Sequence, residues 1–323
     1  MGKELTDAFF QLIEKIPREK IGTFPTPVNQ IHLGKNRHFW VKNDGLCGSE
    51  YGGNKVRKLE YLLPAIKISG QNKLVVQGDE MSHTVAACSI YGRKHGFKVT
   101  AVVFPHGRMD ENENLLPDLV RSGVKIKKTS NMLTALMVAK FISMVPGSYL
   151  VPLGATTPIS TIGYVNAAHE LTKQIERGEL PPIKYIFIPF ATGGTVAGLL
   201  AGLALLDSPI RIIAVQSVDG IIANMRSLKR LLSDVLSLTD QRKYLDAALA
   251  RLKTLDAKYL GKGYRDVTFE SVEAIQQLEP AGLRLETAFT AKAMAALLSS
   301  AHKLQGDEIL FWNTHDQEYC KAG

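Results

Sequence analysis

The sequence predicts an α/β protein of two lobes, each a mainly parallel twisted sheet flanked by helices. Strand-like and helix-like segments alternate from residue 58 to residue 217, and this rhythm predicts parallel strands joined by right-handed crossovers. The segment 185–190, Tyr-Ile-Phe-Ile-Pro-Phe, is apolar throughout, which is typical of a strand buried on both faces. The length of 323 residues exceeds the usual size of a single core, so we expect two lobes.

The expected elements follow in chain order. An amphipathic helix within residues 1–17 precedes a rigid Pro-rich segment at 24–27. Strands are expected at 38–42, 73–77, 98–104, 124–128, 149–153, 185–190, 211–217 and 308–314. Helices are expected at 58–69, 83–96, 111–122, 132–144, 162–178, from 196 onward and at 290–302, and helices should dominate 220–259. We place the smaller lobe at residues 58–164, and the larger lobe combines residues 1–57 with 165–323.

Composition and charge exclude several classes of protein. A hydrophobic content of 45% with 22% charged residues is typical of a soluble globular protein, and no apolar run is long enough to span a membrane. The first 17 residues lack the apolar core and cleavage site of a signal peptide. The net charge of +8 comes from dispersed basic residues without an aromatic platform, so we expect no nucleic-acid partner and instead a pocket that attracts anions.

The cysteines indicate the compartment. Cys47, Cys88 and Cys320 are odd in number, far apart and without the spacing of a metal site. They therefore argue against a disulfide framework and against structural zinc, and we expect no bound metal. A reducing compartment follows, which we take to be the cytoplasm.

The stretch 51–60, Tyr-Gly-Gly-Asn-Lys-Val-Arg-Lys-Leu-Glu, is the first candidate for chemistry. Two glycines let the backbone approach a ligand closely, and Lys55 then falls at the start of an amphipathic helical segment. The positive end of a helix and partial burial both disfavour the ammonium form, so the amine of Lys55 could act as a nucleophile near neutral pH. The alternative is an ordinary solvated lysine in a basic first turn.

The segment 192–195, Thr-Gly-Gly-Thr, is the second candidate. It lies between an apolar strand and a helix, where free amides and hydroxyls form a cradle for phosphate, although a plain tight turn is the alternative. It is neither a Walker A loop nor a dinucleotide GxGxxG motif. A nucleophilic amine and a phosphate cradle in one chain suggest pyridoxal 5′-phosphate as the cofactor, with the lysine on its aldehyde.

These motifs resemble those of the 1-aminocyclopropane-1-carboxylate deaminase and D-cysteine desulfhydrase family, within the tryptophan synthase β-like, fold-type II group of pyridoxal-phosphate enzymes. The resemblance starts with Asp44 and the run 52–63, Gly-Gly-Asn-Lys-Val-Arg-Lys-Leu-Glu-Tyr-Leu-Leu. It extends over about nine tenths of the chain through Pro-Thr-Pro at 25–27 and the segments 149–171, 191–198, 261–264 and 282–294. Such a resemblance implies the two-lobed fold, an amino-acid substrate and a homodimer.

The resemblance also implies roles for individual residues. Lys55 would bind the cofactor aldehyde and then move the Cα proton, supported by Asn54. Thr314 would place a hydroxyl against the pyridine nitrogen, which favours elimination because a hydroxyl cannot pair with the ring's charge as a carboxylate does. The phosphate would be bound by Thr192, Gly193, Gly194, Thr195 and Val196.

Several positions depart from the family pattern. Where the family has Gln-Ser-Asn-His, this chain has Glu80, Met81, Ser82 and His83. Methionine cannot transfer a proton, so any proton transfer by the family serine must be done by a neighbouring residue such as Ser82. Ser82 also occupies the position expected near the ring hydroxyl of the cofactor. Met81, His83 and Thr84 are expected at the substrate, with His83 or Thr84 on its carboxylate. A capping role for Ser82 and Thr84 is the alternative.

Three more positions bear on the reaction. Phe289 replaces the family tyrosine associated with opening of the cyclopropane ring, so deamination of aminocyclopropane-carboxylate is less expected, and Phe289 would contact substrate. Tyr264 is the remaining matching tyrosine and a candidate catalytic group, or else a core or lid aromatic. His315 stands in the closing Thr-Gly-Gly of the family, where it could alter substrate access or simply cap a turn.

The expected function is a lyase that eliminates a β-substituent from a small amino acid such as D-cysteine, giving a keto acid and ammonia. The alternatives are a β-replacement enzyme or racemase on the same scaffold, or a cofactor-binding paralogue without turnover.

Overall fold

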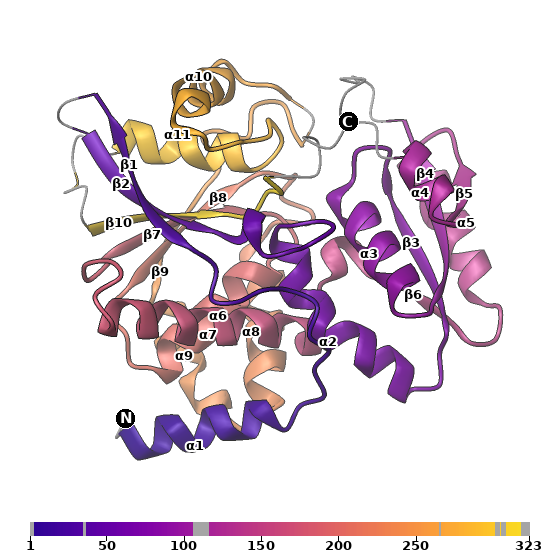
Figure 1. The fold of residues 1–323 in the computed structure, drawn as a ribbon, viewed down its shortest axis with the longest axis horizontal. Helices are drawn as coiled ribbons and strands as arrows, with labels where there is room; N and C mark the ends of the chain where they lie inside the picture. The colour runs from indigo at the N-terminus through magenta and orange to yellow at the C-terminus, as the bar shows by residue number, and fades with distance from the viewer. Residues whose placement is uncertain are drawn as a thin grey trace.

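The computed structural model describes residues 3–34, 37–105, 116–264, 266–300, 304 and 308–317, with two separate sheets joined by helix α2 (Asn54–Ile68) (Figure 1). The strands of the smaller sheet all lie between residues 73 and 150, and those of the larger sheet lie before and after them. The expected α/β architecture with parallel sheets flanked by helices is confirmed. The lobe boundaries at residues 58 and 164 stay a prediction.

The larger sheet has six strands in the order β1-β2-β10-β7-β8-β9. Their bounds are β1 (Val28–Leu33), β2 (Arg37–Asn43), β10 (Ile309–Asn313), β7 (Tyr185–Phe190), β8 (Arg211–Gln216) and β9 (Leu252–Asp256). Neighbours from β2 to β9 pair in parallel, and β1 is the antiparallel edge strand. The carboxyl ends of the central strands therefore meet at one edge, where α/β proteins bind ligands.

Both faces of this sheet are buried, which explains why its central strands are apolar throughout. In β7, Ile186 and Ile188 pack on one face while Phe187 packs on the other, and in β10 Leu310 and Phe311 divide in the same way. One face is covered by α6 (Pro158–Glu176), α7 (Gly194–Leu205), α8 (Met225–Ser237) and α9 (Leu245–Leu249). The other is covered by α10 (Phe269–Leu278) and α11 (Thr290–Ser300).

The smaller sheet has four parallel strands in the order β5-β4-β3-β6. They are β5 (Lys125–Lys128), β4 (Lys98–Phe104), β3 (Lys73–Asp79) and β6 (Ser148–Leu150). Helices α2, α3 (His83–Lys94) and α4 (Leu116–Arg121) cover one face, and α5 (Met132–Ser143) covers the other. Helix α1 (Lys3–Glu14) packs Phe9, Phe10 and Ile13 into the core of the larger lobe.

The structure corrects one segment and adds elements that the sequence patterns did not predict. The segment 220–259, expected to be mostly helical, ends in strand β9, because its Leu252 and Leu255 pack beside β8 at the sheet edge. Strand β1 and helix α10 were not predicted. Residues 111–115 of the expected helix 111–122 lie outside the described residues. Within the described residues, no helix combines the length and apolar composition that crossing a membrane requires.

Helix α2 is held between the lobes by a buried ion network. Arg57 is only 3% exposed, and its Nη2 lies 2.8 Å from Asp44 Oδ1 while its Nη1 lies 2.9 Å from Glu170 Oε2. Tyr164 and Trp312 also donate to Asp44 Oδ2, at 2.7 and 2.8 Å. Segments far apart in sequence thus meet beneath the first turn of α2, and the position of that turn is fixed from several sides.

Candidate active site

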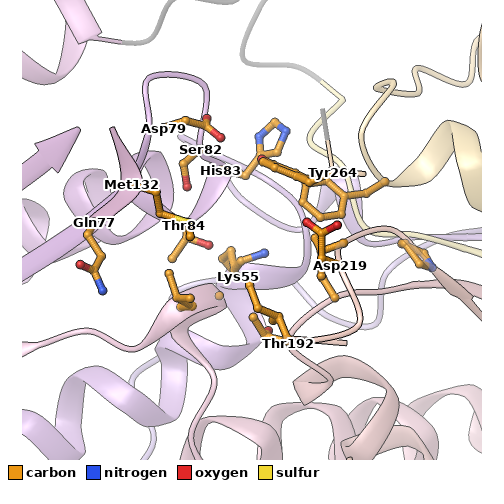
Figure 2. Close-up of a pocket in the computed structure, with 18 of the residues that line it drawn as sticks. Lys55, Gln77, Asp79, Ser82, His83, Thr84, Met132, Thr192, Asp219 and Tyr264 are labelled. Carbon is orange, nitrogen blue, oxygen red and sulfur yellow. The ribbon is translucent and has the colours of Figure 1, made fainter. Parts of the chain in front are cut away.

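A cavity of about 820 Å³ lies between the two sheets, at the carboxyl ends of their strands. Its lining comes from the start of α2, the β3–α3 connection, the start of α5, the β7–α7 connection and the segments around 264, 286 and 314. Figure 2 shows Lys55 reaching into this space, with Gln77 on one side and Tyr264 on the other. Side chains from both lobes therefore face the same cavity.

The glycine pair before Lys55 lies directly against the end of β10. Asn54 donates its backbone N–H to the carbonyl of Thr314 at 3.1 Å, and Gly52 donates to a carboxylate oxygen of Asp316. Gly53 has a φ of 90°, and a Cβ there would lie 2.6 Å from the Thr314 carbonyl oxygen. Only glycine satisfies both the backbone angle and the close approach, so this pairing sets where α2 begins.

Lys55 is the second residue of α2 and faces the cavity. Burial lowers the pKa of its amine from 10.5 to about 8, with Cys88 and Glu286 opposing the shift. Its Nζ lies 2.6 Å from Asn54 Oδ1, and Asn54 Nδ2 donates in turn to Thr195 Oγ1 at 3.2 Å. A hydrogen bond therefore holds the amine of Lys55 in place. Because its pKa is about 8, part of the amine is uncharged near neutral pH and can act as a nucleophile.

The β7–α7 connection forms a cradle of small residues. Gly193 adopts the left-handed conformation, with φ 84°, and precedes the first turn of α7. The hydroxyls of Thr156 and Thr192 lie 2.7 Å apart at its edge. The first N–H groups of a helix have no acceptor within the helix, so this cradle suits an anion.

Lys58 lies beside the cradle, one turn of α2 beyond Lys55. It is 2% exposed, and its Nζ donates to the carbonyl of Gly154 at 3.1 Å and to Thr156 Oγ1 at 3.0 Å. Both acceptors are neutral, and burial together with the charge of Lys55 holds its pKa well below the ordinary value. A buried ammonium with neutral acceptors is stabilised by an anion bound next to it.

The start of α3 forms the opposite wall. Ser82 caps the helix, since its Oγ accepts from the N–H of Val85 at 3.4 Å, and His83 and Thr84 begin the first turn. Ser82, His83 and Thr84 all line the cavity. Met81 is not among the lining residues, and its backbone N–H donates to Asp79 Oδ1 at 3.0 Å. The expected contact of the Met81 side chain with substrate therefore has no support in this geometry.

Tyr264 and Phe289 lie together on the larger lobe, with ring centroids 5.2 Å apart, and both line the cavity. Buried Lys292 holds the Tyr264 segment, because its Nζ donates to the carbonyls of Leu260 and Gly263 at 2.9 and 3.0 Å. Glu286 caps α11 by accepting from the backbone of Phe289 at 2.7 Å. The aromatic pair is thus fixed in place.

This chain is similar in sequence and in fold to known proteins. Residues 20–315 match the family described as pyridoxal-phosphate dependent enzyme. The chain belongs to this family. It is therefore an enzyme that uses pyridoxal phosphate, as its sequence motifs predict.

Individual relatives agree with the assignment. The chain is 27% identical over 319 residues to a protein of Pyrococcus furiosus provisionally named 1-aminocyclopropane-1-carboxylate deaminase, covering 94% of this chain and 93% of the relative. It is also 27% identical to the D-cysteine desulfhydrase of Salmonella schwarzengrund, covering 94% of each chain. The crystal structure of an ACC deaminase homologue superimposes with a TM-score of 0.80 at 25% identity, covering 98% of this chain and 95% of that one.

The residues present fit pyridoxal phosphate. Gly194 provides the clearest observation, since a Cβ there would lie 2.9 Å from Lys58 Nζ and 3.0 Å from the Thr156 side chain. The cradle is thus open only because position 194 lacks a side chain, and the buried amine of Lys58 faces it. An amine with a lowered pKa, that of Lys55, stands across the same cavity. A phosphate at one end and an aldehyde at the other match this arrangement.

The structure brings most of the expected residues together at one cavity. The lining includes Asn54, Lys55, Ser82, His83, Thr84, Thr192, Gly193, Gly194, Thr195, Val196, Tyr264, Phe289 and Thr314. Their chemical roles stay predictions. Sequence reasoning missed Lys58, Glu286 and Lys292. The spacing of three residues from Lys55 to Lys58 puts both on one helical face, a signal that could have identified Lys58.

Proposed function

We propose that this enzyme is a lyase that eliminates the β-substituent of a small amino acid, with D-cysteine as the reference substrate. Lys55 carries the proposal, as a hydrogen-bonded amine with a pKa of about 8 that faces the cavity between the starts of α3 and α7. The relative named D-cysteine desulfhydrase supports the substrate choice. Phe289 supports it too, because a phenyl ring cannot exchange a proton with a cyclopropane carbon.

In this proposal, different residues of the cavity bind different parts of the cofactor and the substrate. Lys58 and the amides and hydroxyls at 192–196 would hold the phosphate, and Lys55 Nζ would hold the aldehyde carbon. The hydroxyl of Thr314 would hydrogen-bond to the pyridine nitrogen and brings no full negative charge. The helix start at His83 and Thr84 orients the substrate carboxylate. When bound, pyridoxal phosphate supplies an electron sink that stabilises negative charge on the substrate Cα.

The proton then moves through Lys55. Once the substrate is bound, Lys55 Nζ would take the Cα proton while Asn54 Oδ1 orients it. The β-substituent leaves with the electron pair of its bond to Cβ. A proton then adds to Cβ, water supplies the oxygen of the keto acid, and the substrate nitrogen leaves as ammonia.

The test uses protein saturated with pyridoxal phosphate. D-cysteine, L-cysteine and β-chloro-D-alanine are offered separately, and keto acid and ammonia are measured. We expect equal amounts of both products from at least one of these substrates and none from the Lys55→Ala variant. An absence of keto acid with every substrate contradicts the proposal. A thioether formed in the presence of an added thiol identifies a replacement enzyme instead.

The assembly and compartment are part of the same proposal. The family resemblance supports a homodimer, and the cysteine pattern supports the cytoplasm. Sedimentation of the cofactor-loaded protein at micromolar concentration tests the first. A mass of one chain, 35.5 kDa, contradicts it.

A further inference from the structure

Three aromatic side chains, those of Tyr51, His83 and His315, meet beside the cavity, and neither Tyr51 nor His315 has a role in the reaction described above. The Tyr51 hydroxyl hydrogen-bonds to Nδ1 of His83, and the His83 ring meets the His315 ring edge-on with centroids 4.8 Å apart. His83 belongs to the smaller lobe, and His315 follows β10 of the larger lobe. The cluster Tyr51–His83–His315 therefore joins the two sides of the cavity, and His83 and His315 line it.

The backbone of His315 is fixed from two sides. Its N–H donates to Asn313 Oδ1 at 3.2 Å, and the next residue, Asp316, accepts from the N–H of Gly52. Its carbonyl oxygen packs so closely on Gly45 that a Cβ there would lie 2.2 Å away. The ring therefore has a defined place, determined by the same contacts that position the start of α2.

The side chain of His315 has unused hydrogen-bonding capacity. It is 6% exposed, and within the described residues neither ring nitrogen has a hydrogen-bond partner. Burial, then the neighbouring charges of His83 and Arg284, hold its pKa well below the ordinary value, so the ring is neutral. A neutral imidazole offers one N–H donor and one acceptor. A buried donor and acceptor without hydrogen-bond partners are energetically unfavourable, and in native proteins such groups commonly bind a ligand or a water.

We propose that His315 recognises the β-substituent of the substrate and selects small amino acids whose substituent both donates and accepts a hydrogen bond, namely a thiol or hydroxyl. This inference rests on the proposed function and adds the chemical class that the cavity prefers. A halogen or hydrocarbon substituent leaves the imidazole unsatisfied, and a site built for a polar substituent discriminates against analogues that lack it. Since the ring is neutral, a carboxylate substituent gains no ion pair from it.

Binding is measured first, without turnover. In a Lys55→Ala background loaded with pyridoxal phosphate, calorimetry gives the Kd of both enantiomers of serine and of alanine. We expect serine to bind more tightly than alanine, and His315→Phe to reduce that preference by roughly tenfold. His315→Gln, which keeps a donor and an acceptor, should retain most of it. The proposal is overturned if His315→Phe weakens the binding of serine and alanine equally, or if it leaves the preference for serine unchanged. In either case the ring contacts a part that both ligands share, or it only supports the protein structure.

Turnover gives the second readout. In the otherwise native enzyme, His315→Phe should lower kcat/KM for cysteine by roughly tenfold relative to β-chloroalanine, whose chlorine is similar in size but donates no hydrogen bond. An equal loss for both substrates overturns the proposal. Failure of the proposed function is recognised separately, since the unaltered enzyme would then form no keto acid from either substrate, whereas the binding preference is measured without turnover.

Discussion

The Nζ atom of Lys58 lies 2.9 Å from the place that a Cβ on Gly194 would occupy. One residue belongs to α2 and the other begins α7, so the lysine helix and the anion cradle meet at this point. The proposed phosphate site is therefore placed relative to Lys55 by the approach of Lys58 to Gly194. Lys58 and Gly194 can be tested separately.

Replacement of Lys58 by Met should weaken cofactor binding by about 10- to 100-fold, because a hydrogen bond between two charged groups is lost. The binding constant comes from absorbance titration of the cofactor-free protein. Lys67→Met provides the matched control, since Lys67 lies on the same helix but is exposed. Equal affinities of the Lys58 and Lys67 variants would remove Lys58 from the phosphate site.

Gly194→Ala should also reduce cofactor binding, for a steric reason. The added methyl group would meet Lys58 Nζ and the Thr156 side chain at 3.0 Å or less, so one of them must move. Gly220→Ala is the control, because its nearest neighbour, Gln216 Nε2, is 3.7 Å away. The same titration measures both variants, and full binding by Gly194→Ala would show that the cradle lies elsewhere.

The rate of cofactor uptake should follow the ionisation of Lys55. Only the neutral amine attacks an aldehyde, and with a pKa of about 8 roughly a tenth of it is neutral at pH 7. Uptake by the cofactor-free protein, followed by stopped-flow absorbance, should therefore rise about tenfold per unit of pH below 8 and level off above it. A rise that continues to pH 10 would mean that burial does not lower this pKa.

The buried network beneath α2 should dominate stability. Arg57→Met leaves Asp44 and Glu170 without their guanidinium and should destabilise the protein by about 3–5 kcal/mol. Urea unfolding measures the change. Lys173→Met, which removes an exposed ion pair with Glu176, should change stability by less than about 1 kcal/mol. Similar values for both variants would show that the network contributes little.

Acid should weaken the same network at a predictable pH. Burial raises the pKa of Glu170, but Arg57 and Lys42 outweigh it and lower the value from 4.5 to about 2. A carboxyl whose pKa falls on folding stabilises above its unfolded value, and this contribution is lost as pH falls from about 4.5 to about 2. Unfolding free energies measured across this range should fall less steeply in Glu170→Gln, and parallel curves would contradict the assignment.

Sequence patterns predicted the fold because most central strands are apolar on both faces, as β7 shows. They failed for β9, whose Leu-Lys-Thr-Leu-Asp carries too few apolar residues to identify a strand. Its conformation comes from pairing with β8, a long-range contact that local periodicity does not contain.

Only part of the site could be predicted from the sequence, because some of its residues depend on long-range contacts. Lys55 and the 192–195 cradle carry local signals of glycine, helix start and hydroxyl groups, so the sequence alone indicated them. Lys58 acquires meaning only from Gly194, its neighbour in space. His315 was indicated as a departure from the family pattern, but its specific role depends on its contact with His83. Lys58 is buried with only neutral acceptors, and His315 is buried with no partner for its ring nitrogens among the described residues. Burial depends on the complete fold.

Borohydride reduction of the enzyme loaded with pyridoxal phosphate, followed by peptide mapping, tests the central claim most directly. Hydride fixes the cofactor to the amine that holds its aldehyde, and Lys55 and Lys58 are close enough in sequence to fall in one peptide, so fragmentation must separate them. We expect one label per chain, on Lys55, and none in Lys55→Ala. A label on Lys58, or an unlabelled chain, would contradict it.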